Sequence, residues 1–450
     1  MAKYKAYPEY KESGVEWLGV IPKGWTISKV KYLAPFQVGW TPPTKNDANF
    51  IGDNLWVNIS DLKDKFISST AKCISDKAAK EASMDITPRG SLLYSFKLSV
   101  GAVSFAGCDL YTNEAIASFL DRAQLPLSYL YYALPIFIIE NASTNIYGAK
   151  ILNQELIKNS FLLAPLHSEA EKIANFLDHE TAKIDNLIEK QQQLIELLKE
   201  KRQAVISHAV TKGLNPDVPM KDSGVEWLGE VPAHWEVKKL KHVANIIDCK
   251  NRTPEYFDDG EYLVVRTTNV KKQSLVLDGA LYTNERDYNI WTERGVPPVG
   301  SILFTREAPA GEVCIVPAFT KLCMGQRMMN FICHESDYTK FLFDYLTSDC
   351  LKRYIESEAA GSTVSHLRVE QVYNIPIVIP PNSEQKNIDE MVGVIKSQYS
   401  RLIDDAECSL VLLQERRTAL ISAAVTGKID VRDWVAPDTQ DVEEPQEATA

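Results

Sequence analysis

The chain has 450 residues, 45% of them hydrophobic and 24% charged, which are proportions typical of a globular protein with two to four domains. Its formal net charge of −11 at first argues against a nucleic-acid partner. Residues 433–450, however, hold six acidic residues and no lysine or arginine, so this segment accounts for −6 of the total. A mildly acidic body can still carry basic clefts, and charge alone does not decide the class of partner.

Three further features of the composition narrow the setting. The longest apolar stretch, 129–139, is too short to cross a bilayer and contains Pro135. The first thirteen residues lack the apolar core of a secretory signal. The eight cysteines form no C-x-x-C pair, which favours free thiols in a reducing compartment. We therefore expect a cytoplasmic protein that does not enter a membrane.

The chain repeats itself with an offset of about 210 residues. Ser13–Gly19, with the sequence SGVEWLG, returns as Ser223–Gly229. The stretch KEKRQAVISHAVTKG, which ends at Gly213, is matched by QERRTALISAAVTGK, which ends at Lys428. The repeat predicts six parts in chain order: an N-terminal segment 1–14, a domain 15–165, a helix 168–212, a domain 225–381, a helix 383–428 and an acidic, disordered tail 433–450.

The two long segments are each predicted to form one amphipathic helix. Apolar residues recur in 168–212 at spacings of three and four, without an interrupting proline or glycine. Ser168 is the expected N-cap, with Glu171 completing a capping box, and Ser383 is the expected N-cap of the second helix. A helix of this length measures about 65 Å, which exceeds one small domain. We predict an antiparallel coiled coil of the two helices; the alternative is that each helix packs on its own domain.

Both globular parts are expected to be mixed α/β, so the fold class is α+β with an internal pseudo-twofold repeat. Strands are predicted at 54–59, 261–266, 301–305 and 313–316, where β-rich runs lie between turn residues. Helices are predicted at 129–139 and 340–358. The resulting chain is two similar α/β domains separated by two long helices.

Polar and basic clusters occupy equivalent places in the two domains, and we predict that they contact DNA. Arginine and lysine suit guanine or phosphate, while asparagine and glutamine suit adenine. The candidates in the first domain are Thr41, Lys45, Asn46, Asn58, Ser60, Lys97 and Asn113. The candidates in the second domain are Lys250, Asn251, Arg252, Arg266, Thr268, Arg306, Gln326 and Arg327. The alternative for each cluster is an ordinary solvated loop. Two unequal heads on a spacer would read two different half-sites, spaced about one DNA turn, ~34 Å, apart.

The sequence also resembles the specificity subunit of type I restriction–modification systems, over roughly residues 10–428. The resemblance rests on the duplicated GVEWLG-x-x-P-x-x-W, on 40–62, 92–107 and 111–119 in the first domain, on 248–270, 302–317 and 324–331 in the second, and on the paired helix ends. It implies that each globular part is a target-recognition domain for double-stranded DNA. It further implies that the long helices dock two modification (methyltransferase) subunits, which are joined by restriction subunits that hydrolyse ATP and cleave DNA.

The chain shows no sign of a catalytic centre of its own. It has no Asn-Pro-Pro-Tyr motif for adenine methylation, no phosphate-binding loop and no H-E-x-x-H motif. We therefore expect no enzyme activity, cofactor or metal in this chain; S-adenosylmethionine, ATP and Mg²⁺ would belong to its partners. The repeated tryptophans Trp17, Trp25, Trp227 and Trp235 are expected in core packing rather than in base stacking.

Two other function classes remain open from the residues. A coiled-coil scaffold whose heads bind proteins would agree with the acidic net charge. A single-chain enzyme that both methylates and cleaves DNA is disfavoured by the missing motifs.

Overall fold

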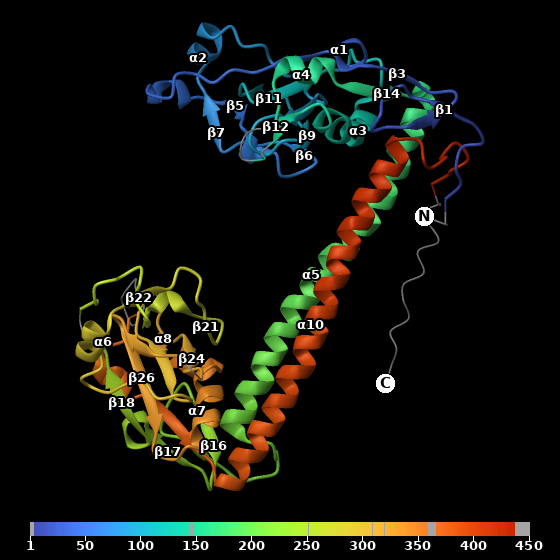
Figure 1. The fold of residues 1–450 in the computed structure, drawn as a ribbon. Helices are drawn as coiled ribbons and strands as arrows, with labels where there is room; N and C mark the ends of the chain where they lie inside the picture. The colour runs from blue at the N-terminus through green and yellow to red at the C-terminus, as the bar shows by residue number, and fades with distance from the viewer. Residues whose placement is uncertain are drawn as a thin grey trace. The chain divides into compact units, whose positions relative to one another are not determined.

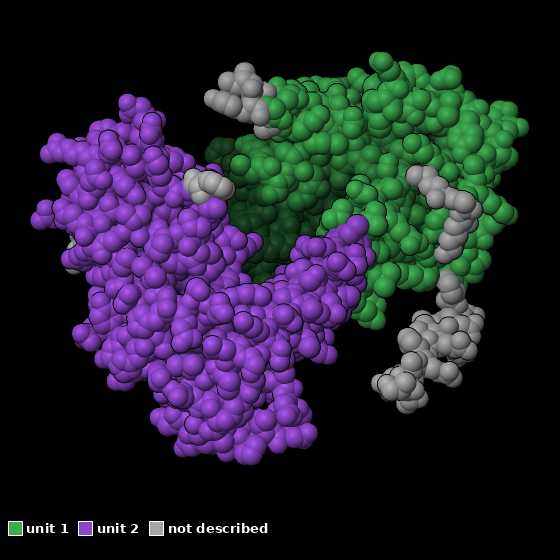
Figure 2. Space-filling model, turned by 60° about the horizontal axis from the view of Figure 1, so that its bottom comes forward, with its two compact units in different colours: residues 1–190, 410–450 green, residues 191–409 purple. Residues whose placement is uncertain are grey.

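The structure is a computed structural model that describes residues 4–144, 148, 150–250, 252–307, 309–318, 320–358 and 366–436. Its residues form two compact units, coloured separately in Figure 2. Unit 1 is Met1–Lys190 with Leu410–Ala450, and unit 2 is Gln191–Ser409. The long helix α5 (His167–Lys212) starts in unit 1 and ends in unit 2, whereas α10 (Asn382–Val425) starts in unit 2 and ends in unit 1 (Figure 1).

Unit 1 contains a five-stranded sheet in the order β4-β11-β8-β9-β6 and a three-stranded sheet in the order β10-β5-β7. Within the second sheet, β10 runs parallel to β5. The elements before α5 are β1 (Tyr10–Glu12), β2 (Val20–Pro22), β3 (Thr26–Lys29), α1 (Val30–Leu33), β4 (Phe36–Val38), η1 (Asp47–Phe50), β5 (Asn54–Val57), η2 (Ile59–Asp61), β6 (Phe66–Ile67), β7 (Lys72–Ile74), α2 (Asp76–Glu81), β8 (Leu92–Ser95), β9 (Val103–Ala106), β10 (Tyr111–Thr112), β11 (Ile116–Phe119), α3 (Leu127–Ile139), β12 (Ser143–Thr144), β13 (Lys150–Ile151), α4 (Gln154–Asn159) and β14 (Phe161–Ala164).

Unit 2 repeats this plan, with one sheet in the order β18-β26-β23-β24 and another in the order β22-β19-β25. Again one pair of the smaller sheet, β19 and β25, is parallel. The elements before α10 are β15 (Met220–Asp222), β16 (Glu230–Pro232), β17 (Glu236–Lys239), η3 (Leu240–His242), β18 (Ala244–Asp248), β19 (Tyr262–Val265), η4 (Thr267–Asn269), β20 (Val270–Lys271), β21 (Ser274–Leu275), β22 (Leu281–Thr283), α6 (Glu285–Trp291), β23 (Ile302–Thr305), β24 (Val313–Ile315), β25 (Leu322–Met324), β26 (Met328–Cys333), α7 (Tyr338–Leu346), α8 (Asp349–Glu358), α9 (Val369–Tyr373) and β27 (Pro376–Ile379). The predicted mixed α/β class of both parts is confirmed, and so are the four predicted strands.

In each unit the long helices pair antiparallel. In unit 1 Arg417 of α10 donates to Asp185 of α5 through two nitrogens, at 2.7 and 3.2 Å. In unit 2 the amide of Gln191 donates to the carbonyl of Ala406 at 3.4 Å. Gln191 therefore lies against the residue that the sequence repeat makes its equivalent. The predicted pairing of the two apolar stripes is confirmed within each unit, because both cores contain side chains from both helices.

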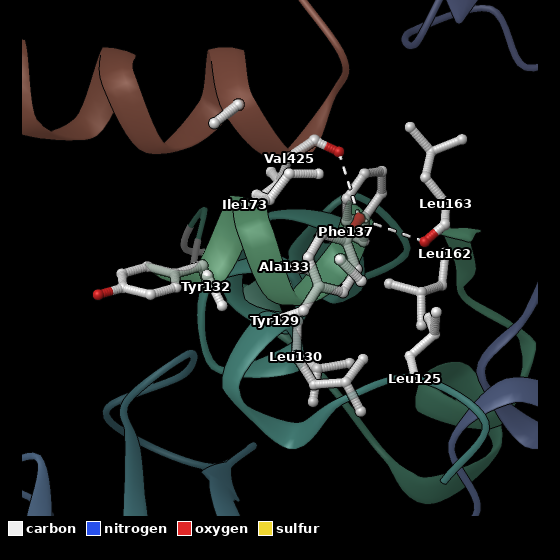
Figure 3. Packing of buried hydrophobic residues seen from close by; sticks show 14 of the residues in the cluster. Leu125, Tyr129, Leu130, Tyr132, Ala133, Phe137, Leu162, Leu163, Ile173 and Val425 are labelled. Carbon is white, nitrogen blue, oxygen red and sulfur yellow. Dashed lines mark hydrogen bonds between the residues drawn. The ribbon is translucent and has the colours of Figure 1, made fainter. Parts of the chain in front are cut away.

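The main core of unit 1 surrounds α3 and the helix pair (Figure 3). Tyr129 is fully buried there, and its hydroxyl lies 3.3 Å from the carbonyl of Leu163 and 3.5 Å from that of Val425, a residue of α10. Phe137 and Ile173 pack in the same cluster. The end of α10 is therefore part of the folding unit that the N-terminal half of the chain builds.

A glycine ends α10 where it meets the N-terminal part of unit 1. Gly427 has φ +74°, and a Cβ atom there would lie 2.4 Å from Pro22 and 3.3 Å from Trp25. Glycine adopts this left-handed backbone without strain and allows the close approach.

The bounds of several helices differ from the sequence predictions, and α10 ends at Val425 rather than at 428. Both long helices begin one residue early, because Ala170 and Gln385 donate to Leu166 and Pro381, so Ser168 and Ser383 lie inside the first turn and are not N-caps. The segment expected to form one helix at 340–358 forms two helices, α7 and α8. At the break between them, the hydroxyl of Ser348 donates a hydrogen bond to the carbonyl of Tyr345.

The expected tail has two parts in relation to the structure. Trp434 packs edge-on against Phe176 of α5, with ring centroids 5.6 Å apart, so the first residues of 433–450 belong to unit 1. Residues 437–450 lie outside the described part of the chain. Within the described ranges, no helix has the length and hydropathy needed to cross a membrane.

Candidate nucleic-acid interface

Four loops meet at one edge of the sheets in unit 1, and they carry the predicted DNA-contacting residues. The loops follow β4, β5, β8 and β10. Backbone hydrogen bonds tie them together: Asn113 N donates to Val57 O at 3.0 Å, Trp40 N to Thr112 O at 2.9 Å, and Phe96 N to Ala115 O at 3.0 Å. The strand directions explain this arrangement: β5 and β10 are parallel, and β4 and β8 also run in one direction because both pair antiparallel with β11.

The close approach of the first loop depends on a glycine. A Cβ atom at Gly39 would lie 1.8 Å from the carbonyl oxygen of Thr112, closer than any real contact. This position therefore has no room for a side chain. It allows the chain after β4 to reach the end of β10, where Thr41 meets Glu114.

Glu114 is the centre of the unit 1 edge. The hydroxyl of Thr41 donates to its carboxylate, and the ammonium of Lys97 lies 3.8 Å from it. Burial raises the pKa of Glu114, but the hydrogen bond from Thr41, a backbone hydrogen bond and the interaction with Lys97 together outweigh burial and hold the pKa below its ordinary value. The structure thus brings the predicted residues Thr41 and Lys97 together on the carboxylate of Glu114, which the prediction did not single out and which follows the predicted Asn113 in the chain.

The three predicted asparagines of unit 1 hold turns through their side-chain oxygens. The side-chain oxygens of Asn46 and Asn58 accept from Ala48 N and Ser60 N, and both residues are N-caps of 3₁₀ helices. Asn113 similarly accepts from Ala115 N. These oxygens are committed to the backbone, which reduces their capacity to accept from an adenine amino group. Lys45 and Ser60 are exposed.

Unit 2 builds the corresponding edge from the loops after β18, β19, β23 and β25. Gly325 N donates to Val265 O at 2.8 Å, Arg306 N donates to Arg327 O at 2.8 Å, and Arg327 N donates to Cys249 Sγ at 3.1 Å. The first two of these contacts match the bonds from Asn113 N and Phe96 N in unit 1, whereas the third joins the same two loops through a cysteine side chain. The register of the central strands gives the same equivalence, since Ser95 pairs with Ile116 in unit 1 and Thr305 with Met328 in unit 2.

An open cavity of about 400 Å³ lies at this edge of unit 2. It is lined by Arg306, Glu307, Gln326, Arg327, His366, Arg368 and Val369. The structure therefore brings three of the predicted residues into one site. His366 and Arg368 were not predicted, because they lie about forty residues further along the chain. They reach the site through a bridge between Glu307 and His366 and through the bond from Leu367 N to Arg306 O, at 3.0 Å.

Carboxylates pair with two of the three arginines in the cavity lining. Arg327 Nε lies 2.8 Å from Glu307, and Arg306 Nη2 lies 3.5 Å from Asp248. Arg306 is 9% exposed, and its Nε has no hydrogen-bond partner among the described residues. A buried guanidinium nitrogen without a hydrogen-bond partner lowers the stability of the folded chain, and such groups are typical of ligand-binding sites.

The other described candidates of unit 2 are not part of the cavity lining. Lys250 pairs with Glu293 at 2.7 Å, and the carbonyl of Arg252 accepts from the indole of Trp291. Arg266 donates to the carbonyl of Gly279 at 2.8 Å, while Thr268 is exposed on η4. Asn251 lies outside the described residues.

The repeated tryptophans hold each unit to a long helix. Trp25 and Trp235 are buried, and their indoles donate to Glu169 of α5 at 3.1 Å and to Glu384 of α10 at 2.8 Å. Trp17 is 42% exposed and lies 5.7 Å from Phe137. The expected packing role is confirmed for the two buried tryptophans. Within the described residues, no three His, Cys, Asp or Glu side chains are grouped so as to hold a metal ion.

Comparison with known proteins matches both halves of the chain to one family. The family model described as "Type I restriction modification DNA specificity domain" matches residues 22–197 and 232–395. The type I restriction enzyme MjaIX specificity subunit of Methanocaldococcus jannaschii is 26% identical over 455 residues, covering 96% of this chain and 99% of that protein. The putative MjaX specificity subunit of the same organism is 25% identical over 49% of each chain.

Two solved structures share the fold. A chain from a study of complex assembly and conformational transition of the type I R-M system has a TM-score of 0.67 at 15% identity, covering 91% of this chain and 99% of that chain. The HsdS subunit from Thermoanaerobacter tengcongensis has a TM-score of 0.51 at 14% identity, covering 93% and 100%. These likenesses extend over nearly the whole length of each chain.

Proposed function

This chain belongs to the type I restriction–modification DNA specificity family, and we propose that it reads a two-part, asymmetric DNA sequence for a type I complex. Unit 1 would bind one half-site and unit 2 the other. The observation that carries the proposal is the repeated edge, where the same four loops converge in each unit with different side chains. One scaffold that presents two unlike surfaces suits a target whose halves differ in sequence.

Charge at the unit 2 edge supports DNA as the ligand. In the lining of the cavity, cationic side chains outnumber carboxylates although the chain as a whole is acidic. The lining holds three arginines, Arg306, Arg327 and Arg368, and one carboxylate, Glu307. Asp248 lies outside the lining and pairs with Arg306 at 3.5 Å. A local excess of positive charge gives phosphate contacts that position the duplex, while base contacts select the sequence.

The partners follow from the same proposal. Two modification subunits would dock on the long helices and methylate the bound target, with restriction subunits joining them. S-adenosylmethionine, ATP and Mg²⁺ would be used by those subunits, and this chain would recognise DNA without catalysis. A partner that methylates adenine would first have to extrude the base from the duplex. The comparisons give no support to the scaffold alternative.

Selection from a random duplex pool, with the modification subunit present, tests the proposal. We expect enrichment of two short sequences separated by a fixed gap, and an affinity that falls with salt in proportion to the phosphates contacted. Binding that shows neither an enriched sequence nor a salt slope would exclude DNA reading and favour the scaffold.

A further inference from the structure

Arg327 has a strained backbone that is held on both sides. Its φ is +67°, in the left-handed region that glycine adopts freely and arginine does not. Its N–H donates to Cys249 Sγ at 3.1 Å, and its carbonyl accepts from Arg306 N at 2.8 Å. Glycine would adopt this backbone conformation with less strain than arginine. The presence of an arginine here therefore indicates that its side chain has a function.

The guanidinium of Arg327 is oriented but still accessible. Glu307 engages Nε at 2.8 Å, and 53% of the arginine side chain stays exposed. Among the described residues, none accepts a hydrogen bond from its two terminal nitrogens. Because Nε is held by Glu307 and both terminal nitrogens are accessible, the guanidinium can donate to a ligand that has two adjacent hydrogen-bond acceptors.

Two DNA groups offer such a pair, a phosphate and the major-groove edge of guanine. The carboxylate of Glu307 discriminates between them. A phosphate would bring a second negative charge to a cation already paired at 2.8 Å, whereas the O6 and N7 acceptors of guanine are uncharged. No other base presents two adjacent acceptors in the major groove. The contact geometry therefore favours guanine.

Unit 1 has no equivalent group. The strand register and matching backbone bonds place Ala115 at the position of Arg327 and Phe96 at that of Arg306. Lys97 replaces Glu307 and pairs with Glu114, so the charge arrangement is also different. The two half-sites would be read by different chemistry at this position.

We infer that Arg327 reads a guanine in the half-site bound by unit 2, and that Glu307 is the residue that positions its guanidinium. This inference rests on the proposed function. It adds the identity of a base and assigns a role to a carboxylate that would otherwise weaken DNA binding.

The decisive variant is Arg327→Gly, since glycine removes the side chain and also suits the backbone. The complex with modification subunits is tested against its selected target and against duplexes with each other base at each position. A lost bidentate contact should cut discrimination about 5- to 150-fold at one G·C pair of one half-site. The other positions should keep their preferences. Arg327→Lys should relax the same pair while it retains more of the total affinity, because lysine keeps the charge but not the fork.

Glu307→Gln tests the positioning role. It should relax the same G·C pair less than Arg327→Gly does, and it should raise affinity for non-specific DNA because a negative charge is removed. A purely structural role would lower both affinities together. Arg353→Ala is the matched control, since Arg353 is an exposed arginine on α8 outside the cavity. It should leave every position unchanged.

The outcomes separate the inference from the proposed function. If the parent complex selects no sequence, the proposed function itself fails. If it selects a two-part sequence but Arg327→Gly weakens all duplexes equally, Arg327 binds phosphate and the inference is overturned. Relaxation at an A·T pair, or no relaxation, would overturn it as well.

Discussion

Two glutamates perform the same task at the starts of the two long helices. Glu169 accepts the indole of Trp25 at 3.1 Å and the hydroxyl of Tyr7 at 2.6 Å, all within unit 1. Glu384 accepts the indole of Trp235 and lies 2.6 Å from a ring nitrogen of His234 in unit 2. Each carboxylate therefore fastens a buried aromatic side chain of a globular part to the first turn of its helix, where a negative charge is favoured by the helix dipole.

Replacing Glu169 should destabilise unit 1. In Glu169→Ala the buried donors of Tyr7 and Trp25 lose their acceptor, which should lower the free energy of unfolding by about 2–4 kcal/mol. Urea unfolding followed by tryptophan fluorescence measures the change. Glu171→Ala, one half-turn away and exposed, is the control and should stay within about 0.5 kcal/mol of the parent. Equal losses in both variants would show that the buried acceptor has no special role.

Asp389 should make unit 2 more stable in mild acid. Burial, and then the nearby Asp344, raise the pKa of Asp389 to about 6, although Lys340 and Lys396 act in the opposite direction. The ordinary value is 3.8, so the folded chain holds this proton more tightly than the unfolded chain does. Stability from this group is therefore fully present below pH 4 and is lost as the pH rises through 6.

Asp389→Asn removes the buried charge and should stabilise unit 2 at pH 7.5 by about 1–3 kcal/mol, with the advantage shrinking toward pH 4. Urea unfolding at several pH values measures both trends. The control is Asp404→Asn, at an exposed position of the same helix, which should change stability little at any pH. A constant difference between Asp389→Asn and the parent across this range would contradict the assigned cause.

At the scale of elements, the periodicity of apolar residues correctly predicted the two long helices. The apolar stripes of 168–212 and 383–428 identified α5 and α10, and the 210-residue repeat identified two equivalent parts. The helix starts were misplaced because Leu166 and Pro381, rather than the serines, supply the first carbonyls. The break between α7 and α8 was missed because it is stabilised by a hydroxyl from another helix: Ser207 accepts from Asp349 N at 3.0 Å.

The site was predicted only where its residues lie next to strands. The repeat placed clusters such as 305–307 and 325–327 at strand ends, and the structure brings them together. Arg368 could not be found in this way, because a distant segment reaches the cavity only through tertiary contacts of Leu367 and His366. The sequence also could not reveal that the oxygens of Asn46 and Asn58 cap turns, since capping depends on the local backbone.

The long helices expose apolar side chains that the antiparallel pairing leaves uncovered. In unit 2 these include Leu197, 60% exposed, and Leu402, 50% exposed. Under the proposed function they suit the modification subunit, since exposed apolar residues on a helix are typical of a docking face. Leu197→Gln and Leu402→Gln together should weaken binding of that subunit at least about tenfold.

Isothermal titration of the modification subunit into each variant measures this effect. Folding should be unchanged, because neither leucine is buried in the separate chain. The control is Gln192→Ala, at an exposed polar position of α5, the helix that also carries Leu197. This variant should bind the modification subunit as the parent does. Parent-like affinity of the double leucine variant would place the docking face elsewhere.

At the scale of the whole molecule, the architecture could be predicted because the sequence repeat corresponds to a repeat of the structure. Equivalent strands, equivalent tryptophan anchors and equivalent glycines at the helix ends recur in both units. What the repeat could not show is that unit 1 is completed by the end of α10. The segment after Gly427 pairs with the N-terminal residues, where Asp430 N donates to Lys5 O at 2.8 Å. The first and last parts of the chain therefore fold together.

The proposed function makes the helix pair the element that sets the gap between half-sites. Gln191 of α5 contacts Ala406 of α10, so seven residues inserted after each of these positions would lengthen both helices and keep them paired. Seven residues preserve the apolar stripe and add about 10 Å of helix. That is close to three base pairs at ~3.4 Å each, so the gap should grow by about three base pairs while both half-sites stay the same.

Methylome sequencing of cells that carry the lengthened chain reads the gap directly. An insertion of equal length after Ala436, beyond the helices, should leave the gap as it was. A gap that also stays unchanged in the lengthened chain would show that the helices do not set the spacing.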